Sequence, residues 1–177
     1  MISQTPILRR ALRVMALVVL PLVQPFAALS DTLEAPEGAV ILTVSGKIDA
    51  TNAGDVAQFD LAMLQALPPT EITTETIWTP NEHVFTGVSL DVFLDHIGAQ
   101  GGTLQAQAIN DYTVEIPVSD AVPGGPIIAY AMDGAPMSRR DKGPLWIIYP
   151  YSSGPEYQTE VIYTRSIWQL DRLTVVE

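Results

Sequence analysis

The chain contains no cysteine in its 177 residues. This absence excludes disulfides, thiolate catalysis and every metal site that depends on a thiolate ligand. Its stability must therefore come from a packed core, and a hydrophobic content of 47% is sufficient to build one. The length suits a single domain.

Cations and histidines are also scarce. Nine Lys and Arg stand against twenty Asp and Glu, which gives a formal net charge of −11. This balance argues against nucleic acid and against anionic membrane surfaces, because both require a positive surface on the protein. The two histidines, His83 and His96, lack the spacing of a zinc site. We interpret His96 as lying on the wet face of a helix and His83 as lying in a surface loop.

The N-terminal segment predicts export. Arg9, Arg10 and Arg13 precede an apolar run over residues 14–22, and small residues follow at 28–30. This order is typical of a cleaved secretory signal peptide, here residues 1–30, and the expected location is the periplasm. The alternative is an uncleaved N-terminal anchor, but the run is shorter than the roughly 20 apolar residues of a spanning helix.

Removal of this segment concentrates the remaining positive charge near the C-terminus. Six cations would then stand against twenty carboxylates, a net charge of −14. All but Lys47 fall in the last forty residues: Arg139, Arg140, Lys142, Arg165 and Arg172. Residues 31–38 are acidic and contain a proline, so we predict a flexible lead-in there and one domain over residues 39–177.

Hydrophobic periodicity predicts an α+β domain, rich in strands that form mixed sheets, with two or three short helices. The expected helices are 61–67, capped by Asp60, and 90–97, where apolar residues recur at helical spacing after Ser89. The expected strands are 40–46, 72–78, 104–108, 113–116, 127–132, 145–149 and 173–176. Residues 80–87 are expected to form an irregular loop, and residues 110–112 a hairpin turn.

The clearest candidate site is a cationic turn. Arg139, Arg140, Asp141 and Lys142 lie between two prolines and precede an apolar strand. Guanidinium groups present paired donors, and aromatic residues follow at 146, 149, 151, 157 and 163, a mixture that suits a small planar polar ligand. Arg165 is a further candidate. The alternatives are a solvated charged turn and, for Arg165, an ion pair with Glu160 or Asp171.

The order of several short motifs resembles a known family. These motifs are Gly87-Val88-Ser89-Leu90, Asn110-Asp111-Tyr112 leading to Ile116-Pro117, Asp133-Gly134-Ala135-Pro136-Met137, Gly143-Pro144-Leu145 and Ser166-Ile167-Trp168-Gln169-Leu170. Together they are similar to the molybdopterin-binding domain of the sulfite oxidase family, over roughly residues 40–176. The resemblance implies the fold of that domain.

One departure from the family pattern bears on activity. In the catalytic members a cysteine ligates molybdenum from the segment similar to residues 74–78, and this chain has no cysteine. The resemblance therefore implies a small exported protein that binds a pterin, in reduced form, without molybdenum. Its expected partner is the periplasmic domain of a membrane receptor, either a kinase or a cyclic-dinucleotide enzyme.

The expected ligand site combines this resemblance with the cationic turn and the aromatic residues that follow it. Trp78, Arg139, Arg140 and Tyr151 are expected to enclose the ligand, Asn110, Asp111 and Asp141 to orient it, and Tyr112, Lys142 and Arg165 to lie beside it. Two other functions stay open at this point. One is a molybdopterin-dependent oxidoreductase of the sulfite oxidase type, and the other is an interaction module without a ligand.

Overall fold

The computed structural model describes residues 33–177. The predicted signal peptide and the first two residues of the predicted lead-in lie outside the described residues. From Leu33 onward the lead-in is hydrogen bonded to the domain. The Leu33 amide donates to Thr51 O (3.1 Å), and the Asn52 side chain donates to Glu34 O (2.8 Å).

All ten strands in this part of the chain join one sheet. They are β1 (Leu42–Gly46), β2 (Ala57–Phe59), β3 (Pro69–Thr76), β4 (Thr79–Ser89), β5 (Thr103–Ala108), β6 (Thr113–Pro117), β7 (Ile127–Met132), β8 (Ala135–Pro136), β9 (Leu145–Ile148) and β10 (Trp168–Val176). The main order is β2-β1-β10-β9-β7-β4-β3, with β5 and β6 attached to β10 and β8 attached to β7. Only β1 and β10 pair in parallel, so the sheet is mixed.

The helices of the described chain are short. The α-helices are α1 (Leu61–Ala66), α2 (Leu90–His96) and α3 (Glu160–Arg165), and the 3-10 turns are η1 (Val118–Asp120), η2 (Tyr151–Ser153) and η3 (Pro155–Tyr157). The predicted fold class, a strand-rich α+β domain with two or three short helices, is confirmed. None of these helices is long and apolar enough to cross a membrane.

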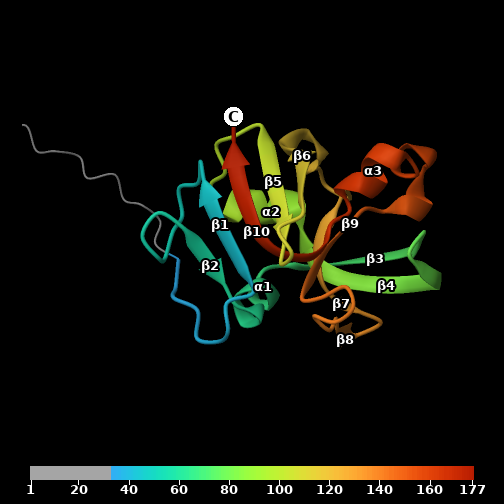
Figure 1. The fold of residues 1–177 in the computed structure, drawn as a ribbon, viewed down its shortest axis with the longest axis horizontal. Helices are drawn as coiled ribbons and strands as arrows, with labels where there is room; N and C mark the ends of the chain where they lie inside the picture. Colours follow the sequence, from blue (N-terminus) through green and yellow to red (C-terminus); the bar gives the residue numbers. More distant parts are fainter. Residues whose placement is uncertain (1–32) are drawn as a thin grey trace, which may run out of the picture.

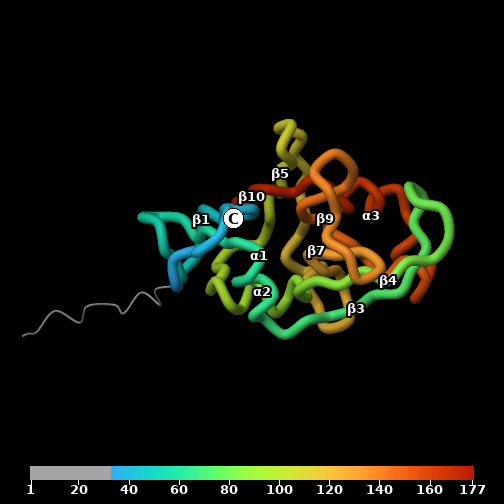
Figure 2. Tube along the Cα trace, turned by 90° about the horizontal axis from the view of Figure 1, so that it is seen from below, coloured from blue at the N-terminus to red at the C-terminus, as the bar shows by residue number. Residues whose placement is uncertain are grey.

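Strand β10 connects the two halves of the sheet. In Figure 1 it curves from the side of α3 up to the C-terminus beside β1. Figure 2, from below, shows the β3–β4 hairpin reaching the end of the molecule that α3 also occupies. The hairpin is fastened there, because the Ser152 amide donates to Thr74 Oγ1 (3.0 Å). The start of β10, the hairpin tip and α3 therefore meet at one end of the domain.

The core lies around the central strands. Strand β9 is buried at all four residues, and β7 is buried at five of its six, from Ile127 to Ala131. Continuous apolar runs of this kind are typical of strands that are covered on both faces. Complete burial of one Ile or Leu side chain stabilises a fold by about 1.5–3 kcal/mol, so these runs hold the sheet together.

The predicted caps of the first two helices differ in their outcome. Asp60 caps α1 as predicted, because its Oδ1 accepts from the Met63 amide (2.9 Å), and this bond also lowers the pKa of Asp60. Ser89 occupies the predicted N-cap position of α2 but caps no backbone amide, and its hydroxyl donates to Asp91 instead. Gly98, which follows the C-cap of α2, has a positive φ of 60°, which favours glycine.

The β3–β4 hairpin corrects two predictions. The expected irregular loop over residues 80–87 is wrong, since these residues belong to the eleven-residue strand β4. Its first residues are polar because the outer part of the hairpin is exposed, and an exposed strand shows no clean apolar alternation. The expected strand 72–78 begins earlier, at Pro69, and ends at Thr76. Ile77 and Trp78 thus form the turn of the hairpin.

Candidate ligand-binding site

A cluster of aromatic rings fills the end of the domain where the hairpin tip, α3 and β10 meet. Trp78, in the hairpin turn, lies at its centre. Its ring centroid is 5.6 Å from that of Trp168 and 5.7 Å from that of Tyr163, and both rings meet it edge-on. Trp146 and Tyr151 also meet it edge-on, at 5.8 Å and 6.2 Å. The cluster thus contains all three tryptophans of the chain, so its surroundings determine the intrinsic fluorescence.

A cavity of about 580 Å³ opens beside this cluster. Its lining comes from the hairpin turn, the β5–β6 turn, α3 and the start of β10. The lining residues are Ile77, Trp78, Asn110, Tyr112, Glu160, Tyr163, Thr164, Ser166, Ile167 and Trp168. Cavities of 300–1,000 Å³ with aromatic walls and a few polar groups are typical of small-molecule sites. The volume and the rings suit one planar heterocycle.

Buried hydrogen bonds support the wall behind the cavity. The Tyr151 hydroxyl donates to Ser166 Oγ (2.6 Å), and Ser166 Oγ donates to Ile162 O (2.7 Å). The indole nitrogen of Trp146 donates to the Ser166 carbonyl (3.1 Å). Tyr151 is only 3% exposed, and burial raises its pKa well above the ordinary value. Its hydroxyl therefore acts as a neutral donor that holds the wall, and Tyr151 does not line the cavity itself.

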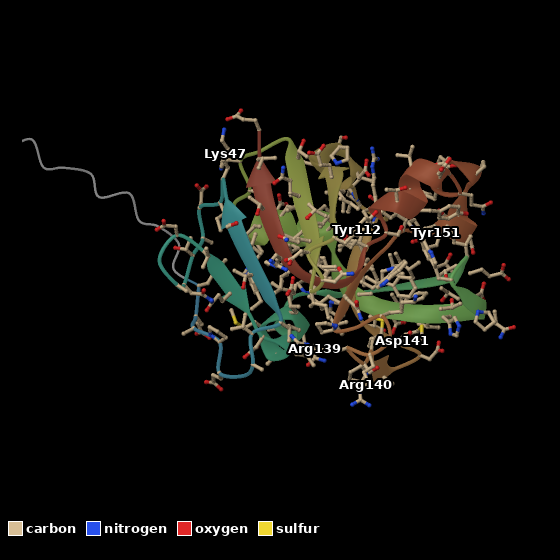
Figure 3. All side chains as sticks on the ribbon, viewed as in Figure 1. Lys47, Tyr112, Arg139, Arg140, Asp141 and Tyr151 are labelled. Atoms are coloured by element: carbon tan, nitrogen blue, oxygen red, sulfur yellow. The ribbon has the colours of Figure 1, made fainter. Side chains whose placement is uncertain are left out.

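The predicted cationic turn lies next to the cluster but not in the cavity. Figure 3 shows Arg139, Arg140 and Asp141 near β8, away from Tyr112 and Tyr151. All three are exposed, and none lines the cavity. Gln169 fixes the turn, because its side-chain amide donates to Arg139 O (2.7 Å). The fourth predicted member, Lys142, points at the cluster and places its ammonium 4.1 Å from the Trp168 ring centroid.

The other predicted polar residues divide between the mouth of the cavity and ion pairs. Asn110 and Tyr112 line the mouth. Asp111 instead accepts from Arg172 (2.9 Å), and its positive φ of 67° fits the predicted hairpin turn. Arg165 pairs with Asp120 (2.8 Å), so the alternatives of Glu160 and Asp171 as its partner are wrong.

The same Asp120 oxygen also accepts from the Tyr149 hydroxyl (2.8 Å). Burial and this hydrogen bond raise the pKa of Tyr149.

His83 lies on β4 and not in a loop, which corrects the prediction. Its Nδ1 is 2.7 Å from Asp133 Oδ2, and its Nε2 is 2.8 Å from Pro80 O. Both partners are acceptors, so both contacts are hydrogen bonds only when the ring is protonated on both nitrogens. The bond to the Asp133 carboxylate accordingly raises the pKa of His83, and the same bond lowers the pKa of Asp133. The pair fastens the β7–β8 turn to the hairpin.

Seven of the ten residues that line the cavity were not among the predicted site residues. Tyr163, Ser166, Ile167 and Trp168 form its inner side, together with Glu160 and Thr164 at the mouth. Within the segment 163–168 only Arg165 was predicted as a site residue, and it pairs with Asp120 instead. The available signal was three apolar or aromatic residues, at 163, 167 and 168, around a single serine. A short helix followed at once by a strand turns these side chains toward the same space.

Comparison with known proteins identifies the fold as a domain of the molybdopterin-binding type. The family model for the oxidoreductase molybdopterin binding domain matches residues 42–158. The chain therefore belongs to this family, as its motifs predicted. Among solved structures, it is similar to the sulfane dehydrogenase SoxCD from Paracoccus pantotrophus, with a TM-score of 0.56 and 15% sequence identity. That similarity covers 76% of this chain but only 37% of the other, and it shows a shared fold. A search of curated proteins found no match.

The donor set does not fit a molybdenum ion held by a thiolate. The chain has no cysteine, and hydroxyl oxygens do not replace a soft sulfur ligand. In the segment where the resemblance places that ligand, Thr74 Oγ1 lies 3.0 Å from Ser152 Oγ, and Thr76 Oγ1 lies 2.8 Å from Thr79 Oγ1. Within residues 33–177 no group of three His, Asp or Glu is placed to hold a metal ion. No step of a reaction is therefore assigned to molybdenum here.

Proposed function

We propose that this protein is an exported, non-catalytic binding protein for a reduced pterin, and that it passes ligand occupancy to the periplasmic domain of a membrane signalling partner. The cavity beside Trp78 carries this proposal. It is an aromatic-walled space of about 580 Å³ in a domain whose family binds a pterin cofactor, and the chain has no thiol to hold the metal of that cofactor. The cavity can therefore bind a ligand by ring stacking, but the chain cannot carry out redox chemistry that depends on a thiolate.

Exposed apolar side chains around the mouth of the cavity support the proposal that a partner protein binds there. Three large apolar side chains are unusually exposed there or directly beside it: Ile77 at 63%, Tyr112 at 54% and Val161 at 57%. Exposed apolar groups that gather in one place are typical of protein contacts. A partner that covers this rim would also contact a bound ligand. Ligand and partner would then stabilise each other, which is the coupling that a relay needs.

Calorimetric titration of the purified protein with tetrahydropterin tests ligand binding. We expect saturable heat at one site per chain, together with a change in tryptophan fluorescence. Tyr112→Ala should weaken binding about tenfold, since stacking on one ring contributes on the order of 1–3 kcal/mol. Val122→Ala is the matched control, because Val122 is exposed but does not line the cavity. Absence of both heat and fluorescence change would exclude this function.

Partner binding is tested with the periplasmic domains of membrane kinases and cyclic-dinucleotide enzymes from the same organism. We expect one of them to bind more tightly when the pterin is present. Val161→Ser should weaken that complex at least fivefold, and Val122→Ser should leave it unchanged. If the ligand-bound protein binds none of these domains, the relay is wrong even where the pterin binds. Fractionation of cells that express the chain checks the periplasmic location.

A further inference from the structure

The cavity has an unusual charge for a family named after a phosphate-bearing cofactor. Its ten lining residues, all within residues 33–177, include no lysine, arginine or histidine. The only charged side chain is Glu160, the first residue of α3, at the mouth. Phosphate sites in proteins use Arg, Lys or backbone amides to balance the charge. This cavity offers an anion no such side chain and presents a carboxylate instead.

The cations nearest in the chain are already engaged. Arg165 pairs with Asp120 (2.8 Å), and Arg172 pairs with both Asp111 and Asp171 (2.9 Å each). Lys142 lies over the ring of Trp168 and is not a lining residue. A phosphate in the cavity would therefore have to draw one of these groups away from its partner. Burial of an unpaired charge costs several kcal/mol, so phosphorylated ligands are disfavoured.

The carboxylate of Glu160, by contrast, is available for a ligand. Among the described residues it has no hydrogen-bond or ion-pair partner, and only its backbone carbonyl is used, as the acceptor for Thr164 Oγ1 (2.9 Å). A carboxylate accepts two parallel N–H groups, as it does from a guanidinium. The amino-pyrimidine edge of a pterin, with its amino group and the adjacent ring N–H, presents the same pair of donors.

We infer that the cavity takes an unphosphorylated, uncharged pterin and rejects phosphate-bearing pterins, molybdopterin included, and that Glu160 accepts from the amino-pyrimidine edge. This inference rests on the proposed pterin function and specifies its ligand class. The rings of Trp78 and Trp168 provide the apolar walls, and Glu160 provides both recognition of the edge and repulsion of anions. The residues around the cavity thus select the free heterocycle over the cofactor for which the family is named.

The test compares dihydroneopterin with dihydroneopterin monophosphate, which differ only in the phosphate. Both are titrated into the purified full chain by calorimetry. We expect the monophosphate to bind at least tenfold more weakly. Equal or tighter binding of the monophosphate would overturn the inference while leaving the proposed function intact. Binding of neither compound would overturn both.

Three variants separate the two roles of Glu160. Glu160→Gln should weaken dihydroneopterin binding about tenfold, because one charge-assisted acceptor is lost, and should narrow the difference between the two compounds. Thr164→Lys adds a cation at the mouth and should strengthen binding of the monophosphate selectively. Glu156→Gln, an exposed carboxylate that does not line the cavity, is the control and should change neither affinity. If Glu160→Gln behaves like this control, Glu160 does not contact the ligand and the inference is wrong.

Discussion

The hydrogen bond between Tyr151 and Ser166 gives a sharp test of how the cavity wall is held. Both residues are buried, at 3% and 1% exposure, and Ser166 Oγ is the hydrogen-bond partner of the Tyr151 hydroxyl. Ser166→Ala leaves that hydroxyl buried without a partner, which costs about 1–3 kcal/mol. Tyr151→Phe removes the donor but leaves Ser166 bonded to Ile162 O, so its cost is about 0.5–1.5 kcal/mol.

The double variant is the informative measurement. Once Ser166 is alanine, Tyr151→Phe removes an unsatisfied hydroxyl, so it should be neutral or stabilising in that background. The double-mutant cycle formed by these three variants should therefore give a coupling free energy between Tyr151 and Ser166 of about 1–2 kcal/mol. Urea unfolding followed by tryptophan fluorescence detects this, because about 2 kcal/mol moves the midpoint by about 1 M at an m-value near 2 kcal/mol/M.

Two controls complete this experiment. Tyr157→Phe should be neutral, since its hydroxyl has no hydrogen-bond partner within the described residues. Pterin affinity of Tyr151→Phe should stay within about twofold of wild type, because Tyr151 lies behind the cavity wall. If Tyr151→Phe destabilises the Ser166→Ala protein as much as it does wild type, the two hydroxyl groups are not coupled and this hydrogen bond does not hold the wall.

Three further predictions concern other parts of the molecule. Because the pKa of His83 is raised, its pair with Asp133 stabilises the fold below pH 6.5, and this stabilisation is lost as the pH rises through the raised pKa. Because the pKa of Asp133 is lowered, the stabilisation from the pair is also lost at acid pH, as the pH falls below 3.8. Thermal melting against pH should therefore show a decline on the alkaline side that His83→Ala flattens. Gly87→Ala should destabilise by at least about 3 kcal/mol in urea, because its Cβ would collide with the backbone of Ile128, whereas Gly102→Ala should stay within about 0.5 kcal/mol. Arg140→Ala should leave pterin affinity unchanged in calorimetry, because its side chain is exposed and outside the cavity.

Local patterns in the sequence predicted local structure well. Helix α2 followed from apolar residues at helical spacing, and β7 from an unbroken apolar run. The start of β4 could not be predicted this way, because Pro80, Asn81 and Glu82 are exposed. Glu82 is held in the strand by its pairing with Glu75 of β3, whereas Pro80 and Asn81 lie at a register shift between paired residues, and Asn81 has a positive φ of 66°. This arrangement depends on the partner strand, and no periodicity within the segment indicates it.

The site was harder to predict because it is assembled from distant segments. The cavity joins a hairpin turn at residue 78, a second turn at residue 112 and a helix–strand junction at residues 160–168. Trp78, Asn110 and Tyr112, which the family resemblance indicated, line this cavity. Arg139 and Arg140 were also predicted, because charge stands out in an acidic chain, but both are exposed and lie outside the cavity. The charge pattern does not indicate which aromatic rings pack together. Their packing depends on how the curved strand β10 brings distant segments side by side.

Analysis of the protein purified from its native host shows whether the chain carries a free pterin or the molybdenum cofactor. Mass spectrometry of the released small molecules and elemental analysis of the same sample report pterin and molybdenum together. We expect an unphosphorylated pterin bound to the protein and no stoichiometric molybdenum. Molybdenum at one atom per chain, accompanied by molybdopterin, would contradict it.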